Sequence, residues 1–203
     1  MVDDWAKTIL EIDLIDGLRH GVCVSNLTYL IAKKLGLSDE ECNNLAVAGM
    51  VHDIGKLRLS SYLYGRNSNG MIIEEIQYMR KHSRLGYEIL KKYSYNDAIC
   101  EAVLYHHENY DGSGYPDNLK AEKIPLGARI RRVADAFIAF ISERPYREAY
   151  DFDSAISIMI EDVKEYDMQV FLAFMDVIHE DGMLEKIRQD QMSIDYDMEE
   201  LNF

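Results

Sequence analysis

The stretch of residues 106–116 decides how this chain is interpreted, and it runs His106-His107-Glu108-Asn109-Tyr110-Asp111-Gly112-Ser113-Gly114-Tyr115-Pro116. Apolar residues recur near a helical period over 97–110, which predicts a helix that ends at the two histidines. The glycines and the proline predict a loop after it. Neighbouring positions on a helix point about 100° apart, so we expect His106 and His107 to serve two adjacent metal ions rather than one. Taken alone, the pair would be better explained as a helix cap before a turn.

The other histidines favour a metal site. The chain has six histidines, and five of them lie in the motifs His20, His52-Asp53, His82 and His106-His107. Each motif belongs to a different expected helix or helix end. A lone histidine is more often an ordinary hydrogen-bonded or surface residue, as we interpret His179. Ligands that project from several helices into the middle of a bundle instead predict a polynuclear metal site.

Two carboxylates lie where burial without a partner would be unfavourable. Ser38 and Glu41 form a capping-box pattern, and the helix that it begins continues through an apolar run to Asp53. Asp135 lies in the middle of a helical segment, 128–141, that is apolar on most sides. A buried carboxylate needs a charged or metal partner. We therefore expect Asp53 and Asp135 to bind metal together with the histidines. Asp16 stands four residues before His20, on the same helix face, where it could reach a shared ion.

The remaining sequence is also helical in pattern. Apolar residues follow a helical period in 16–34, 83–92, 153–166 and 167–180, and no segment alternates as a β-strand does. We therefore predict an all-α fold, a helical bundle with the metal site in its core. The segment 57–73 is rich in turn-forming residues and is either a plain loop or the cover of a cleft.

The expected organisation is a single domain with two flanking segments. Residues 1–15 form a helical lead-in, 16–180 form the domain, and 181–203 form an acidic tail. The tail is a last helix, a docking segment or a frayed end, and composition does not choose among these.

Composition excludes several classes of function. The net charge of −14 argues against duplex nucleic acid and anionic membranes, because both need a basic face. There is no basic-then-apolar leader and no run of about 18 apolar residues, so we expect a cytoplasmic protein. The three cysteines are scattered among apolar helical patterns and are expected to be reduced core residues: Cys23, Cys42 and Cys100.

In their order along the chain, these motifs resemble the HD superfamily of metal-dependent phosphohydrolases. The stretch 106–116, followed by Ile124-Pro125 and by Arg144-Pro145-Tyr146-Arg147, is similar to the HD-GYP subfamily. The resemblance covers roughly residues 16–174. It implies a helical core that holds two or three iron or manganese ions and hydrolyses cyclic di-GMP or a related cyclic dinucleotide.

The resemblance also implies roles for individual residues. Asp53 would bridge two ions, which an imidazole cannot do. A water shared by these ions would attack the phosphorus. Lys56 would lie beside the phosphate as a charged donor. The substrate would contact Gly114 and Tyr115 of the loop together with Arg144 and Arg147.

Two residues depart from the family pattern. Asp16 stands where three-metal members have Glu, and its shorter side chain disfavours a third ion. Ile138 stands where the family usually has a second Asp that engages the substrate. We expect Ile138 to lie on the face of Asp135, toward the mouth of the metal cleft, and to weaken activity on cyclic di-GMP.

Two alternatives to an active phosphodiesterase stay open. The chain could be a metal-loaded helical module that senses a nucleotide or docks a partner without turnover. It could also be a mixed-valent iron oxygenase on the same kind of helical fold. Metal analysis together with a phosphodiester hydrolysis assay separates the three. The sequence does not indicate the oligomeric state, the upstream signal, or whether the product is a linear dinucleotide or GMP.

Overall fold

The structure, a computed structural model, describes residues 4–63, 77–143 and 147–200. Within these ranges the regular elements are helices, and no β-strand occurs, so the all-α prediction is confirmed. In chain order the α-helices are α1 (Asp4–Lys34), α2 (Asp39–Val51), α3 (Lys56–Leu63), α5 (His82–Lys92), α6 (Asp97–Leu104), α7 (Leu126–Ile141), α8 (Phe152–Glu161), α9 (Met168–Ile178) and α10 (Met183–Glu200).

Local side-chain caps explain where several helices begin. Ser38 and Glu41 form the predicted capping box, in which the Glu41 carboxylate accepts from the Ser38 amide at 2.9 Å. The side chains of Asn96, Asp151 and Asp167 cap α6, α8 and α9, and each accepts from a backbone N–H of the first turn. These caps satisfy amide groups that have no partner inside the helix.

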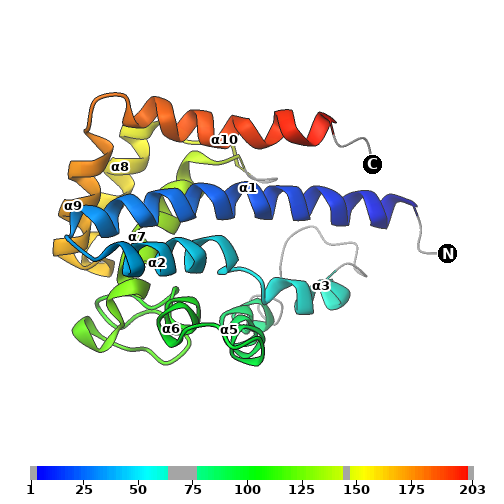
Figure 1. Ribbon diagram of the computed structural model, residues 1–203, viewed down its shortest axis with the longest axis horizontal. Coiled ribbons are helices and arrows are strands. Elements are labelled where there is room, and N and C mark those ends of the chain that lie inside the picture. The colour runs from blue at the N-terminus through cyan, green and yellow to red at the C-terminus, as the bar shows by residue number, and fades with distance from the viewer. Residues whose placement is uncertain (1–3, 64–76, 144–146, 201–203) are drawn as a thin grey trace.

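Helix α1 is the central element of the bundle (Figure 1). It packs against α2, α7, α9 and α10, and α10 runs back alongside it. Helices α5 and α6 pair with each other, and α6 also contacts α2 and α7. The core is continuous through these contacts, with Leu27, Ile31, Phe137 and Phe174 almost fully buried. The three cysteines are buried and free, as predicted.

The structure corrects several predicted helix limits. Helix α1 continues without a break across the expected boundary at residue 16, and α10 makes much of the acidic tail helical. Residues 56–63 form helix α3 rather than irregular chain, and the rest of that predicted loop up to residue 73 lies outside the described residues. Helix α6 ends at Leu104, before the histidine pair, which therefore lies in a turn.

In the described part of the chain, no helix combines the length and the apolar character needed to cross a membrane.

Candidate metal centre

Seven of the eight predicted ligands converge at one place in the bundle. They come from α1, from the turn after α2, from the start of α5, from the turn after α6 and from the middle of α7. Six of the seven form two groups of three, and within each group the potential ligand atoms all lie within 4.8 Å of one another. We call His82, His106 and His107 the imidazole cluster. We call His20, His52 and Asp53 the mixed cluster.

In the imidazole cluster, three ring nitrogens face one another. The Nε2 atom of His82 lies 3.0 Å from Nε2 of His106 and 3.1 Å from Nε2 of His107. The reasoning that kept His106 and His107 on separate ions assumed that both lie on a helix, and this assumption is wrong. In the turn after α6 their rings approach to a centroid distance of 4.0 Å, and both point at His82.

Backbone carbonyl groups set the tautomers of these rings. The Nδ1 atoms of His82 and His106 lie 2.7 and 2.6 Å from the carbonyl oxygens of Met79 and Val103. Because a carbonyl oxygen only accepts, Nδ1 carries the proton in each ring, and Nε2 of the neutral ring carries a lone pair. Burial lowers the pKa of His82 and holds that of His106 well below the ordinary value, so both rings are neutral at pH 7.

This arrangement fits a metal ion. Two lone pairs that face each other at 3.0 Å repel unless a cation lies between them or beside them. Histidine ligands usually donate the other ring N–H to a carbonyl or a carboxylate, as His82 and His106 do here. His52 follows the same pattern, because its Nδ1 donates to the Gly49 carbonyl at 2.7 Å and its Nε2 faces Asp53 at 3.2 Å.

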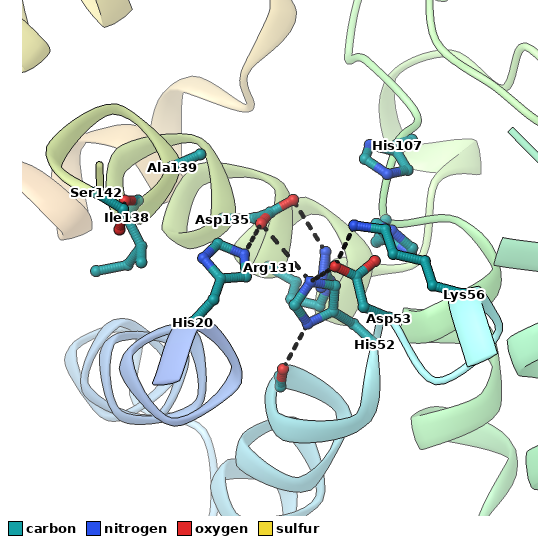
Figure 2. A network of polar contacts seen from close by, with 12 residues as sticks. His20, His52, Asp53, Lys56, His107, Arg131, Asp135, Ile138, Ala139 and Ser142 are labelled. Atoms are coloured by element: carbon teal, nitrogen blue, oxygen red, sulfur yellow. Dashed lines mark hydrogen bonds and ion pairs between the residues drawn. The ribbon is translucent and has the colours of Figure 1, made fainter. Parts of the chain in front are cut away.

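Figure 2 shows the two carboxylates, Asp53 and Asp135, near His52. Asp53 contacts residues of both clusters. One of its oxygens is 3.2 Å from His52 Nε2, and the other is 3.4 Å from His82 Nε2. Asp135 Oδ1 lies 2.9 Å from His20 Nε2 and 3.8 Å from His52 Nε2. Burial would raise the pKa of Asp53, but His52 and Lys56 outweigh it and hold that pKa well below its usual value. Both carboxylates are therefore available as anions.

Lys56 begins α3 at the open side of the centre. Its Nζ atom lies 2.6 Å from Asp53 Oδ2, and about half of the side chain is exposed. This position places a positive charge next to the residue that faces both clusters, and a contact of Lys56 with a phosphate stays a prediction.

The loop of residues 108–119 packs directly against the imidazole cluster. The Tyr115 ring stacks on His107 at a centroid distance of 4.6 Å, and the Arg80 guanidinium lies over the Tyr115 ring. Gly114 is needed for packing within the chain, and its contact with a substrate stays a prediction. A Cβ atom there would lie 2.3 Å from both the His107 carbonyl oxygen and the Asn109 nitrogen.

Three predicted site residues are placed elsewhere or lie outside the description. Asp16 is more than half exposed and pairs with Arg19 at 2.8 Å, so it does not join either cluster. The Arg147 guanidinium donates to the carbonyl oxygens of Ala139 and Phe140 at the end of α7, which directs it to the main chain. Arg144 lies outside the described residues.

The predicted placement of Ile138 is wrong, and its expected effect on activity stays a prediction. Its side chain is fully buried in the hydrophobic core and not at the mouth of a cleft. Figure 2 shows Ile138 on the opposite side of His20 from Asp53. The reason is that residues three positions apart on a helix differ by about 60°, enough to turn Ile138 from the metal side into the core.

Sequence reasoning missed two residues that shape this centre. Arg131 lies one turn before Asp135 on α7, is fully buried, and donates from Nη2 to Asp135 Oδ2 at 3.2 Å. Glu108 is buried behind His107 and accepts from the amides of Asp117 and Leu119 at 2.7 and 3.0 Å, which ties the loop to the cluster. The i, i+4 spacing of Arg131 and Asp135 in the sequence could have predicted their ion pair, because residues four positions apart are neighbours on a helix.

Comparison with known proteins identifies the family. The family model described as "HD domain" matches residues 6–170. The chain is 42% identical over 139 residues to the cyclic di-GMP phosphodiesterase response regulator RpfG of Xanthomonas campestris pv. campestris (strain 8004), covering 67% of this chain and 36% of that protein. It is 34% identical over 157 residues to 3′3′-cGAMP-specific phosphodiesterase 1 of Vibrio cholerae serotype O1, covering 75% and 36%.

The fold comparison agrees with the sequence comparison. The crystal structure of the cyclic GMP-AMP specific phosphodiesterase V-cGAP3 of V. cholerae superposes with a TM-score of 0.67 at 15% identity, covering 89% of this chain and 52% of that one. The chain thus spans little more than a third of the length of the two relatives named above. It belongs to the HD domain family, and its relatives support the resemblance to the HD-GYP subfamily that its ordered histidine and aspartate motifs predict.

Proposed function

We propose that this chain is a metal-dependent phosphodiesterase domain that hydrolyses a cyclic dinucleotide, with cyclic di-GMP as the first candidate. The observation that carries the proposal is the pair of clusters that Asp53 faces with its two oxygens. Imidazole and carboxylate ligands suit iron and manganese, and a carboxylate can bridge two ions. Two such ions supply a nucleophilic water at neutral pH and neutralise charge on the phosphate oxygens.

The residues of the chain have distinct tasks in this proposal. His20, His52 and Asp135 hold one ion, the imidazole cluster holds the other, and Asp53 is shared. The carbonyl groups of Gly49, Met79 and Val103 keep Nε2 of three histidines free of a proton. Asp16 does not contact these residues, so we propose two ions rather than three.

Lys56 and Tyr115 are the proposed substrate contacts nearest to the clusters. The Lys56 ammonium can swing from Asp53 to a phosphate oxygen, because about half of the side chain is exposed. The Tyr115 ring, already stacked on His107, offers an edge and a hydroxyl to a base or ribose. Arg144 and Arg147 remain proposed contacts on the strength of the family resemblance alone.

The substrate class rests on the relatives. Their names specify cyclic di-GMP in one case and 3′3′-cGAMP in another, so the shared chemistry is a cyclic dinucleotide with at least one guanine. A cytoplasmic location and an upstream signalling domain or protein partner also remain proposals.

The test is hydrolysis of cyclic di-GMP and 3′3′-cGAMP by manganese-loaded protein, with the products separated as linear dinucleotide and GMP. Lys56→Ala should lower turnover roughly ten- to a hundredfold, because a charge-assisted hydrogen bond contributes about 1.5–3 kcal/mol. Its metal content should be normal. Lys91→Ala is the matched control, because Lys91 is equally exposed and also bonds an aspartate at 2.6 Å. Metal-loaded protein that binds a dinucleotide without cleaving it would instead support a sensor module.

A further inference from the structure

Arg131 is the largest fully buried side chain of the described residues, and it lies at the back of the metal centre. Its Nη2 atom donates to Asp135 Oδ2 at 3.2 Å, while the other oxygen of Asp135 faces His20 at 2.9 Å. The two oxygens of one carboxylate are therefore divided between a guanidinium and the mixed cluster. Figure 2 shows Asp135 between Arg131 and His20.

The hydrogen bonds of Arg131 are too few for a structural cross-link. Its Nε and Nη1 atoms are buried and have no hydrogen-bond partner among the residues that the structure describes. An arginine that stabilises a fold normally uses its donors fully, since a buried donor without a partner is costly. Arg129, on the same helix, shows the ordinary pattern: it donates to the Ile124 carbonyl and forms an ion pair with Asp167. Arg131 is thus unusual, because two of its buried nitrogen atoms lack a hydrogen-bond partner among the described residues.

The charge of Arg131 is permanent, because a guanidinium does not lose its proton in a protein. It lies within the electrostatic reach of His106 and His107 as well as Asp135. A metal ion on the free oxygen of Asp135 would share that carboxylate with the guanidinium. Their repulsion, even at an effective dielectric constant of about 20, is large enough to change metal affinity by at least about tenfold.

We propose that Arg131 is a positioning residue of the metal centre, which holds Asp135 through Oδ2, restricts it to one oxygen as a ligand, and weakens the binding of the ion there. The inference rests on the proposed metal centre and deepens it. It predicts that removal of the guanidinium tightens the binding of the ion at the mixed cluster. The guanidinium also adds a positive charge next to the metal centre of an acidic protein, which favours an anionic substrate.

The test is manganese binding to the metal-free protein, measured by competition with a chelator, together with the melting temperature without and with manganese. Arg131→Met should bind the ion at the mixed cluster at least about tenfold more tightly than the parent does, and should show a larger manganese-induced rise in melting temperature. Arg131→Lys, which keeps the charge, should resemble the parent. Arg129→Met is the matched control and should leave manganese affinity unchanged. If Arg131→Met does not fold, Arg131→Gln carries the same expectation, because its amide can still donate to Asp135.

Two outcomes separate this inference from the proposed function. If the parent binds no manganese, the proposed metal centre itself is wrong. If the parent binds manganese but a folded Arg131→Met or Arg131→Gln binds it equally or more weakly, only the role given to Arg131 is overturned.

Discussion

The two halves of the metal centre differ in how their charge is balanced. The imidazole cluster offers three histidine rings, and backbone carbonyl groups fix the free nitrogens of two of them, His82 and His106. The mixed cluster has Asp53 among its members and Asp135 within 2.9 Å of His20. An ion at the first cluster would keep most of its charge, whereas an ion at the second would be largely neutralised, except that Arg131 opposes it. A substrate phosphate would therefore meet two unlike ions.

The largest effect should come from Asp53→Ala, because Asp53 is the residue that the two clusters share. We expect loss of most of the bound metal at both clusters and loss of hydrolysis by about 1,000-fold or more, as for other residues on which a centre depends. Elemental analysis of anaerobically purified protein measures the first effect. His179→Ala is the control, because His179 is exposed and bonds only the Met175 carbonyl among described residues. A variant with full metal content would contradict the bridging role.

Removing one histidine from each cluster tests whether the clusters are separate sites. His106→Ala and His20→Ala should each lower the metal content from about two ions to about one, because each removes one of three or four ligands from a single ion. Electron paramagnetic resonance of the manganese-loaded variants should show an isolated ion in place of a coupled pair. Loss of both ions in either variant would mean that the clusters bind metal as one unit.

Ile138→Asp tests whether a further carboxylate can join the mixed cluster from the next turn of α7. Because Ile138 is fully buried in the hydrophobic core, we now expect no gain in cyclic di-GMP turnover. The free energy of unfolding should fall by at least about 3 kcal/mol, since a charge is buried without a partner. Urea denaturation measures this, and Ile138→Val should cost only about 0.5–1.5 kcal/mol. Improved turnover in a stable Ile138→Asp protein would restore the original expectation for this position.

The pH dependence of the metal-free protein should reflect mainly the imidazole cluster. Burial lowers the pKa of His82 and holds those of His106 and His107 well below the ordinary value. The unfolded chain takes up protons on these residues near pH 6.5, whereas the folded chain does not. Stability should therefore be complete above this pH and fall as pH decreases below it, by up to about 1.4 kcal/mol per pH unit for each histidine.

Urea denaturation of chelator-treated protein at several pH values measures the slope of the free energy of unfolding against pH. His106→Phe should make the slope shallower, because the ring that no longer titrates stays buried. His179→Ala should leave it unchanged. A slope that is the same in the parent and in His106→Phe would show that the buried histidines do not control acid stability.

The sequence by itself determined the fold class, several helix starts and the identity of the ligand-type residues. Helical periodicity and the caps at Ser38 and Asp167 are local, so they can be predicted without tertiary contacts. The ordered motifs also predict the family, which the comparison confirms. Because a buried carboxylate without a partner is unfavourable, the sequence also indicated that Asp53 and Asp135 need a charged or metal partner.

Only the tertiary structure decided which of these residues meet. His82 and His106 belong to different helices, and their facing nitrogens depend on how α5 packs on α6. Two further outcomes could be seen only in the folded chain. Arg147 donates to a carbonyl group near the end of α7, and Ile138 is buried in the core. Sequence spacing predicts a helix face only to within a few tens of degrees. Contacts between segments far apart in the chain decide which partner lies opposite that helix face. They therefore also decide the unusual position of Arg131.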